Sequence, residues 1–114
     1  MKVMMNGTIV LKDNFSDNEK CGQVINTLMK AFPGAQLNLS KYNLVTLEWS
    51  GHGFDKDASM ASLNEIKDDF LFIHLEFVSS DLSSKWFVRM EDSALYTVDC
   101  YLEPIPDTKK VYQS

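Results

Sequence analysis

The feature that most limits the fold of this chain is an apolar stripe of helical spacing, bounded on both sides by signals that start and stop a helix. Its members recur at intervals of three and four residues, which places them on one helical face: Cys21, Val24, Ile25, Leu28, Met29 and Phe32. Ser16 and Glu19 form a capping-box pattern before the stripe, and Pro33-Gly34 ends it. The sequence therefore predicts a helix with one face buried.

Alternating apolar and polar residues, the pattern of half-buried strands, flank this helix. The pattern occurs at residues 7–12, 36–40, 43–50, 71–78, 86–90 and 95–102. A second, shorter helix is predicted from near Ser59, with Leu63, Ile66 and Phe70 as its stripe. The order is β-α-β-β-α-β-β-β. This predicts an α+β fold whose first six elements match the ferredoxin-like split βαβ arrangement, an antiparallel sheet with two helices on one face.

The length of 114 residues suits one domain with its own hydrophobic core. We predict a single α+β domain over residues 1–103 and a partly disordered tail over residues 104–114. Cys21 and Cys100 are not in a paired motif, as expected in a reducing compartment. No stretch approaches the roughly 18 apolar residues of a membrane span, and no secretory pattern is recognised. A cytoplasmic location, without membrane contact, is therefore expected.

The charge of the chain argues against direct nucleic-acid binding. The net charge is −5, and Arg89 is the only arginine. Recognition of phosphates and base edges depends heavily on arginine. A nucleic-acid module would need its lysines to gather into one basic groove: Lys2, Lys12, Lys41 and Lys85.

The chemistry-bearing residues form no known catalytic or metal-binding motif. The chain has no nucleophile elbow, phosphate loop or dinucleotide-binding glycine pattern. Its two histidines, His52 and His74, lack the spacing of zinc ligands. We therefore predict no enzymatic activity, no metal and no cofactor. The alternative is a small-ligand-binding or enzymatic domain in which His74, Glu76 and Arg89 converge in a pocket and orient an anionic ligand.

Several aromatic residues are predicted on the strand faces opposite the clearer apolar ones. An exposed aromatic sheet face is typical of a protein interface. The candidate contact residues are Phe72, His74, Glu76, Phe87, Arg89 and Tyr101. The partner would be another protein or a second copy of this chain. Trp49 and Trp86 are instead expected to pack against each other in the core.

One segment resembles a nucleic-acid-binding family. Residues 41–48, KYNLVTLE, are similar to the central strand of RNA-recognition motifs. The resemblance implies a ferredoxin-like domain that stacks bases on strand aromatics. Asn43, Leu44 and Leu47 depart from the small and aromatic residues of that strand. RNA recognition is therefore a further alternative function.

A second resemblance covers residues 59–102. A helix, then Glu76-Phe77, Asp81, Trp86 and a terminal hairpin resemble small ferredoxin-like domains carried on bacterial plasmids and phages, whose function is largely unassigned. The resemblance implies a mobile-element origin. With the acidic charge and the exposed aromatics, it leads to one leading hypothesis. The chain would be a non-enzymatic protein-binding module, for example a phage or mobile-element inhibitor of a host nucleic-acid-handling or defence protein.

Overall fold

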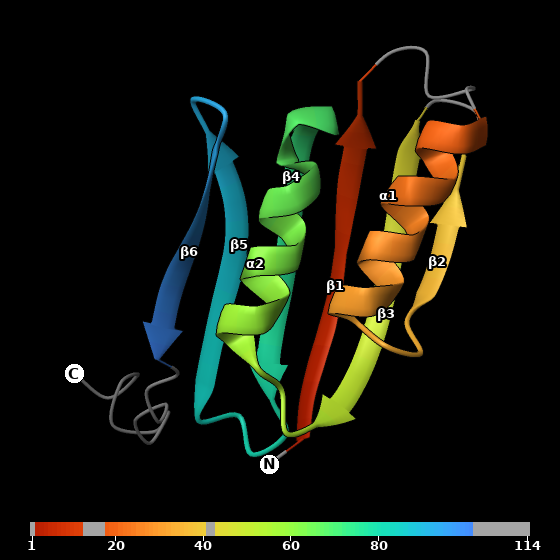
Figure 1. The fold of residues 1–114 in the computed structure, drawn as a ribbon. Helices are drawn as coiled ribbons and strands as arrows, with labels where there is room; N and C mark the ends of the chain where they lie inside the picture. The colour runs from red at the N-terminus through yellow and green to blue at the C-terminus, as the bar shows by residue number, and fades with distance from the viewer. Residues whose placement is uncertain (1, 13–17, 41–42, 102–114) are drawn as a thin grey trace, which may run out of the picture.

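The computed structural model describes residues 2–12, 18–40 and 43–101, except for the side chains of residues 18, 19, 100 and 101. Six strands, two α-helices and one 3₁₀ turn follow one another in this described part (Figure 1). In chain order they are β1 (Lys2–Leu11), α1 (Asn18–Ala31), β2 (Gln36–Leu39), β3 (Leu44–His52), α2 (Lys56–Ile66), the 3₁₀ turn (Lys67–Asp69), β4 (Phe70–Ser79), β5 (Ser84–Glu91) and β6 (Ala94–Tyr101).

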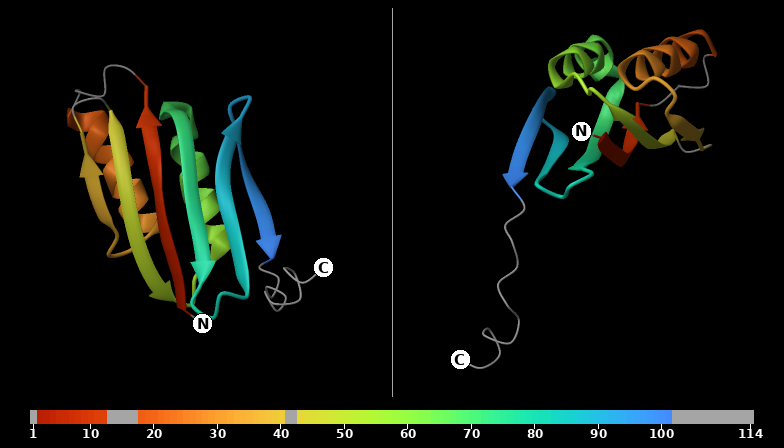
Figure 2. Two further views of the ribbon diagram at one scale, coloured as in Figure 1. Left: turned by 180° about the vertical axis from the view of Figure 1, so that it is seen from behind. Right: turned by 90° about the horizontal axis from the view of Figure 1, so that it is seen from below.

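The strands form one six-stranded sheet in the order β2-β3-β1-β4-β5-β6, and every neighbouring pair is antiparallel. Both helices lie on the same face of this sheet (Figures 1 and 2). The predicted α+β class is therefore confirmed. The exact ferredoxin-like topology is not confirmed by this strand order.

The hydrophobic core lies between the helices and the three middle strands. Val24, Leu28 and Phe32 are fully buried, so the predicted stripe of α1 does face the sheet. Met29, also predicted in that stripe, is exposed. The fully buried side chains that meet α1 and α2 from the sheet include Ile9, Leu11, Val45, Leu47, Ile73, Leu75 and Phe77. Burial of such side chains stabilises the fold by roughly 1.5–3 kcal/mol each relative to exposure.

Strand β1 begins five residues earlier than the predicted strand. Val3 and Met5 are buried while Lys2 and Met4 are exposed, so the alternation of a half-buried strand already holds here. Strand β3 extends beyond its predicted end at residue 50. Lys2 pairs with His52 and Val3 with Gly51, so pairing with β1 keeps the backbone of β3 extended past the glycine.

Helix α2 also begins earlier than predicted, at Lys56 rather than near Ser59. Asp55 is its N-cap, with extended backbone (φ −97°), and its carboxylate accepts a hydrogen bond of 3.1 Å from the backbone N–H of Ala58. An aspartate in this position satisfies an otherwise unpaired N–H of the first turn. The capping box predicted for α1 cannot be compared, because Ser16 lies outside the described residues.

The strands β5 and β6 form a hairpin at the edge of the sheet next to β4. Asp92 and Ser93 adopt positive φ angles of 50° and 64° between the paired residues Glu91 and Ala94. Two consecutive residues of this kind are typical of the tight turn that suits the twist of a hairpin. Its outer strand is tied to α2 by an ion pair of 2.8 Å between Lys56 and Asp99.

No helix in the described part of the chain is long and apolar enough to cross a membrane. The predicted tail at residues 104–114 and the predicted connection at Lys41-Tyr42 lie outside the described residues.

Candidate ligand-binding pocket

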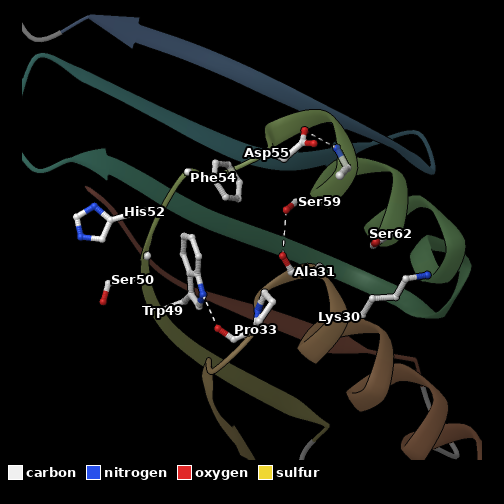
Figure 3. A pocket seen from close by; sticks show the side chains of 13 residues that line it. Lys30, Ala31, Pro33, Trp49, Ser50, His52, Phe54, Asp55, Ser59 and Ser62 are labelled. Carbon is white, nitrogen blue, oxygen red and sulfur yellow. Dashed lines mark hydrogen bonds between the residues drawn. The ribbon is translucent and has the colours of Figure 1, made fainter. Parts of the chain in front are cut away.

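A pocket of about 470 Å³ opens where the end of α1, the start of α2 and the last residues of β3 meet (Figure 3). We call it the Trp49 pocket. Its lining is more apolar than polar, with Pro33, Trp49 and Phe54 as the largest apolar side chains. Lys30, His52 and Ser62 contribute polar groups. A concave, mainly apolar lining with a few polar groups is typical of a small-molecule site.

Trp49 is held in the wall of the pocket by two features of its surroundings. Its ring lies over Gly51, where a Cβ atom would come within 2.6 Å of Cζ2. Its indole N–H donates a hydrogen bond of 2.9 Å to the backbone carbonyl of Pro33, just after α1 (Figure 3). This bond joins the end of α1 to β3 and satisfies both polar groups.

A second bond joins the two helices across the pocket. The hydroxyl of Ser59 on α2 donates a hydrogen bond of 3.0 Å to the carbonyl of Ala31, and Ser59 is only 6% exposed (Figure 3). Carbonyls in the last turn of a helix have no partner within the helix. The hydroxyl of Ser59 is therefore the hydrogen-bond partner of the Ala31 carbonyl, and this bond links α2 to the end of α1.

The remaining polar groups of the pocket are available to a ligand. Ser62 is only 8% exposed, and its hydroxyl has no hydrogen-bond partner among the described residues. Lys30 lies 3.9 Å from Glu65, which is a long ion pair between exposed side chains and contributes little. His52 is exposed beside the pocket, away from Lys30 (Figure 3).

Among the described residues no cluster of three or more His, Cys, Asp or Glu side chains could hold a metal ion. Cys21 is a partly buried free thiol on α1.

Five of the six predicted contact residues lie away from this pocket, on the sheet face opposite the helices: Phe72, His74, Glu76, Phe87 and Arg89. The register of β4 and β5 places His74 opposite Arg89 and Glu76 opposite Phe87. Phe72 on β4 is 49% exposed. Tyr101 pairs with Ser84 through its backbone, and its side chain lies outside the described residues. Five of the six candidates are therefore neighbours on β4 and β5.

The ring of Phe87 is the centre of this group. The centroid of His74 lies 5.4 Å from it, and the charged groups of Arg89 and Lys85 lie 5.2 and 5.3 Å from it. Such cation–π contacts stabilise exposed groups by about 0.5–1 kcal/mol. Glu76 is bound to Lys85 at 2.8 Å, and no ion pair or hydrogen bond joins it to His74 among the described residues.

Sequence reasoning missed the Trp49 pocket, although its residues carried signals. His52 lies between two glycines, and Trp49 was expected in the core. The expected contact between Trp49 and Trp86 is wrong, because Phe54 lies between them, with ring centroids 5.4 Å from Trp49 and 6.1 Å from Trp86. Phe54 follows Gly53 in the short connection between β3 and α2, which strand and helix patterns do not describe.

Neither a family model nor a curated protein matches this chain. Among solved structures, the chain is similar to LarC2, the C-terminal domain of a cyclometallase involved in the synthesis of the NPN cofactor of lactate racemase, in its apo form. The identity is 14%, the match covers 98% of this chain and 84% of that chain, and the TM-score is 0.38.

This neighbour corrects the leading functional hypothesis. We predicted a non-enzymatic protein-binding module, with a phage or mobile-element inhibitor as its concrete form, and the neighbour is a domain of an enzyme. We do not retain that hypothesis. At this TM-score the similarity transfers no activity to the present chain. The resemblance to plasmid and phage domains stays a prediction, since none of the comparisons concerns it.

Proposed function

We propose that this chain binds a small, ring-bearing and mainly apolar molecule in the Trp49 pocket. The observation that carries the proposal is the pocket itself, which combines a volume of about 470 Å³ with an aromatic wall formed by Trp49 and Phe54. Ligand sites of drug-sized molecules have volumes of about 300–1,000 Å³ and are lined mostly by apolar and aromatic groups.

Binding is favoured over catalysis by the use of the pocket's polar groups. The hydroxyl of Ser59 and the N–H of Trp49 both donate to backbone carbonyls, so each has a structural partner. The carboxylate of Asp55 is occupied as the cap of α2. A catalytic nucleophile needs an adjacent base that activates it, and these groups are instead hydrogen-bonded to the backbone. Ser62 and His52 remain for polar contacts that orient a ligand.

We also propose that β1 to β4, with α1 and α2, form a split βαβ unit to which the β5–β6 hairpin is added. The partial order β2-β3-β1-β4 and its antiparallel pairing support this assignment. In such a unit the connection from β3 to α2 lies at one end of the sheet, where it can form a wall of the pocket.

The proposal is tested by blocking the pocket from an exposed helix position. Ala58 is exposed and lines the pocket, whereas Ala61 is exposed on the same helix away from it. Binding of 2-naphthol is followed by NMR through the indole N–H of Trp49 and the amides of Gly51 and Gly53. Ala58→Phe is expected to weaken binding at least about tenfold, or about 1.4 kcal/mol, and Ala61→Phe to leave it unchanged.

Two results would reject the proposal. One is the absence of any shift at Trp49, Gly51 and Gly53 with 2-naphthol and with other fused aromatic rings. The other is equal weakening by the two phenylalanine substitutions, because that would place the ligand elsewhere or reflect a general loss of the fold.

A further inference from the structure

Phe54 is the central ring of an aromatic cluster that extends beyond the Trp49 pocket. Its ring centroid lies 5.4 Å from Trp49, 5.2 Å from Phe77 and 6.1 Å from Trp86. It also lies 6.3 Å from Phe32. One side chain from a short connection therefore packs among four rings: Phe32 just after α1, Trp49 on β3, Phe77 on β4 and Trp86 on β5.

A second pocket, of about 360 Å³, lies on the other side of Phe54. We call it the Trp86 pocket, and Val3, Gly53, Phe54, Lys56 and Trp86 line it. Gly53 and Phe54 also line the Trp49 pocket. The two pockets thus share one wall, and that wall is the side chain of Phe54 with the glycine before it.

The two tryptophans that flank Phe54 differ in their hydrogen bonding. The N–H of Trp49 donates to Pro33. The N–H of Trp86 is buried and has no acceptor among the described residues. An unsatisfied buried donor costs about 1–3 kcal/mol. Such an atom in a native structure calls for an explanation, and a ligand acceptor is one.

An acceptor can reach this N–H only if a side chain against the ring of Trp86 moves. Phe77 stacks on it at 5.3 Å and is only 1% exposed, so it is fixed in the core. Lys56 lies over the ring at 5.5 Å and is held by Asp99 at 2.8 Å. Phe54 is partly exposed and follows Gly53, whose φ of +64° favours glycine. Phe54 is therefore the ring that can leave.

We propose that the Trp49 and Trp86 pockets are two ends of one ligand site, closed in the middle by Phe54. The ring of the ligand takes the place of Phe54 between the two tryptophans, and a carbonyl or carboxylate oxygen of the ligand accepts the N–H of Trp86. The ligand class is thus a ring-bearing molecule with a hydrogen-bond acceptor. This inference rests on the proposed function, because it assumes that a ligand enters through the Trp49 pocket.

The test compares two probes of the same shape, 2-acetylnaphthalene, which has an acceptor, and 2-ethylnaphthalene, which has none. The acetyl compound is expected to bind about three- to tenfold more tightly, the range of one neutral hydrogen bond. It should also shift the indole N–H resonance of Trp86 downfield. Trp86→Phe keeps the ring stacked on Phe77 and should abolish the difference between the probes. Trp49→Phe, the matched control, should leave that difference in place.

Failure of this inference can be told apart from failure of the proposed function. Equal affinities for the two probes, with binding still blocked by Ala58→Phe, would overturn the role of Trp86 and leave the proposed function standing. Binding of neither probe would overturn both.

Displacement of Phe54 is tested without relying on a variant. In the wild-type protein, nuclear Overhauser contacts from the naphthalene protons to the rings of both Trp49 and Trp86 are expected. Contacts to Trp49 alone would show that Phe54 stays in place and would overturn the joined site. Phe54→Ala, if it folds, should strengthen both probes by a similar factor, because no ring has to leave; weaker binding of both would count against the displacement.

Discussion

The indole ring of Trp49 lies so close over Gly51 that a Cβ atom at position 51 would be 2.6 Å from Cζ2 and 3.1 Å from Cη2. Residues two apart on a strand share one face, so the glycine provides the space that the ring fills. The position of the Trp49 ring in the pocket wall therefore depends on the absence of a side chain at Gly51. This role of Gly51 becomes apparent only from the position of the ring in the structure.

Replacing Gly51 by alanine should displace Trp49 and loosen the pocket. We expect a loss of about 1–3 kcal/mol in the free energy of unfolding, the usual cost of overpacking, measured by urea denaturation. The fluorescence of Trp49, read in a Trp86→Phe background, should shift to longer wavelength. Gly22→Ala in α1 is the control, since its Cβ would meet nothing within 4 Å and should stabilise the helix by up to about 1 kcal/mol. Equal effects of the two alanines would refute the close fit.

Gly7→Ala should be more damaging than Gly51→Ala. A Cβ at position 7 would lie 2.7 Å from the Cα of Leu75 and would also clash with the carbonyl oxygen of His74, both backbone atoms of β4. Backbone cannot rotate away as an indole can, so β1 and β4 would have to separate locally. We expect a loss above about 3 kcal/mol or failure to fold, seen in denaturation midpoints and in the dispersion of the NMR spectrum. Stability near that of the wild type would contradict this geometry.

Ser59 and Ser62 are both buried on α2 but should respond differently to alanine. Ser59→Ala removes the donor to the carbonyl of Ala31 and should cost about 1–2 kcal/mol. Ser62→Ala removes a hydroxyl without a partner and should change stability little. Thermal unfolding of the two variants measures the difference. A larger cost for Ser62→Ala would mean that its hydroxyl has a structural partner rather than being free for a ligand.

Asp81 should contribute a pH dependence in the acid range. Hydrogen bonds from the side chain and then the backbone of Ser83, and from the hydroxyl of Ser79, lower the pKa of its carboxyl from 3.8 to about 2. A carboxyl with a lowered folded-state pKa stabilises the fold above its unfolded pKa, and this stabilisation is lost as the pH falls through the folded value. The loss should therefore fall between about pH 4 and pH 2.

The measurement is a carboxyl NMR titration together with unfolding curves at several pH values. Asp81→Asn should show a smaller drop in stability between pH 4 and pH 2 than the wild type. Ser83→Ala should raise the pKa of Asp81 toward 3.8. An Asp81 carboxyl that titrates near 3.8 in the wild-type protein would show that these hydrogen bonds are absent in solution.

Much of the fold followed from periodicity, because long apolar patterns are local. The buried face of α1 at Val24, Leu28 and Phe32 was predicted, and so was the alternation of β4 from Ile73 to Phe77; Leu71, predicted on the same face, is exposed. The start of β1 was missed because Lys2 to Asn6 are ambiguous alone, and their strand character comes from pairing with residues of β3 and β4. Tertiary pairing of that kind is not readable in a short window.

The site was harder to predict than the fold. A strand pattern predicts which side chains share a face, and five of the six predicted open-face residues do share one: Phe72, His74, Glu76, Phe87 and Arg89. The Trp49 pocket depends instead on the three-residue connection Gly53-Phe54-Asp55 and on contacts between segments distant in the chain. Phe54 carries no pattern of its own, and its role comes from the four rings around it.

The central place of β1 has a consequence for how the chain folds. Lys2 pairs with His52 and Val3 with Ser79, whereas β5 and β6 meet across the two residues between Glu91 and Ala94. Contacts between distant segments slow folding because loop closure must come first. During synthesis, β1 therefore leaves the ribosome long before β3 and β4. Until they follow, the backbone groups on both of its edges are unpaired, and Val3 and Met5, which are buried in the folded protein, are exposed. A strand that waits for distant partners in this way is prone to aggregation while the chain is being made, and we expect β1 to need protection at that stage.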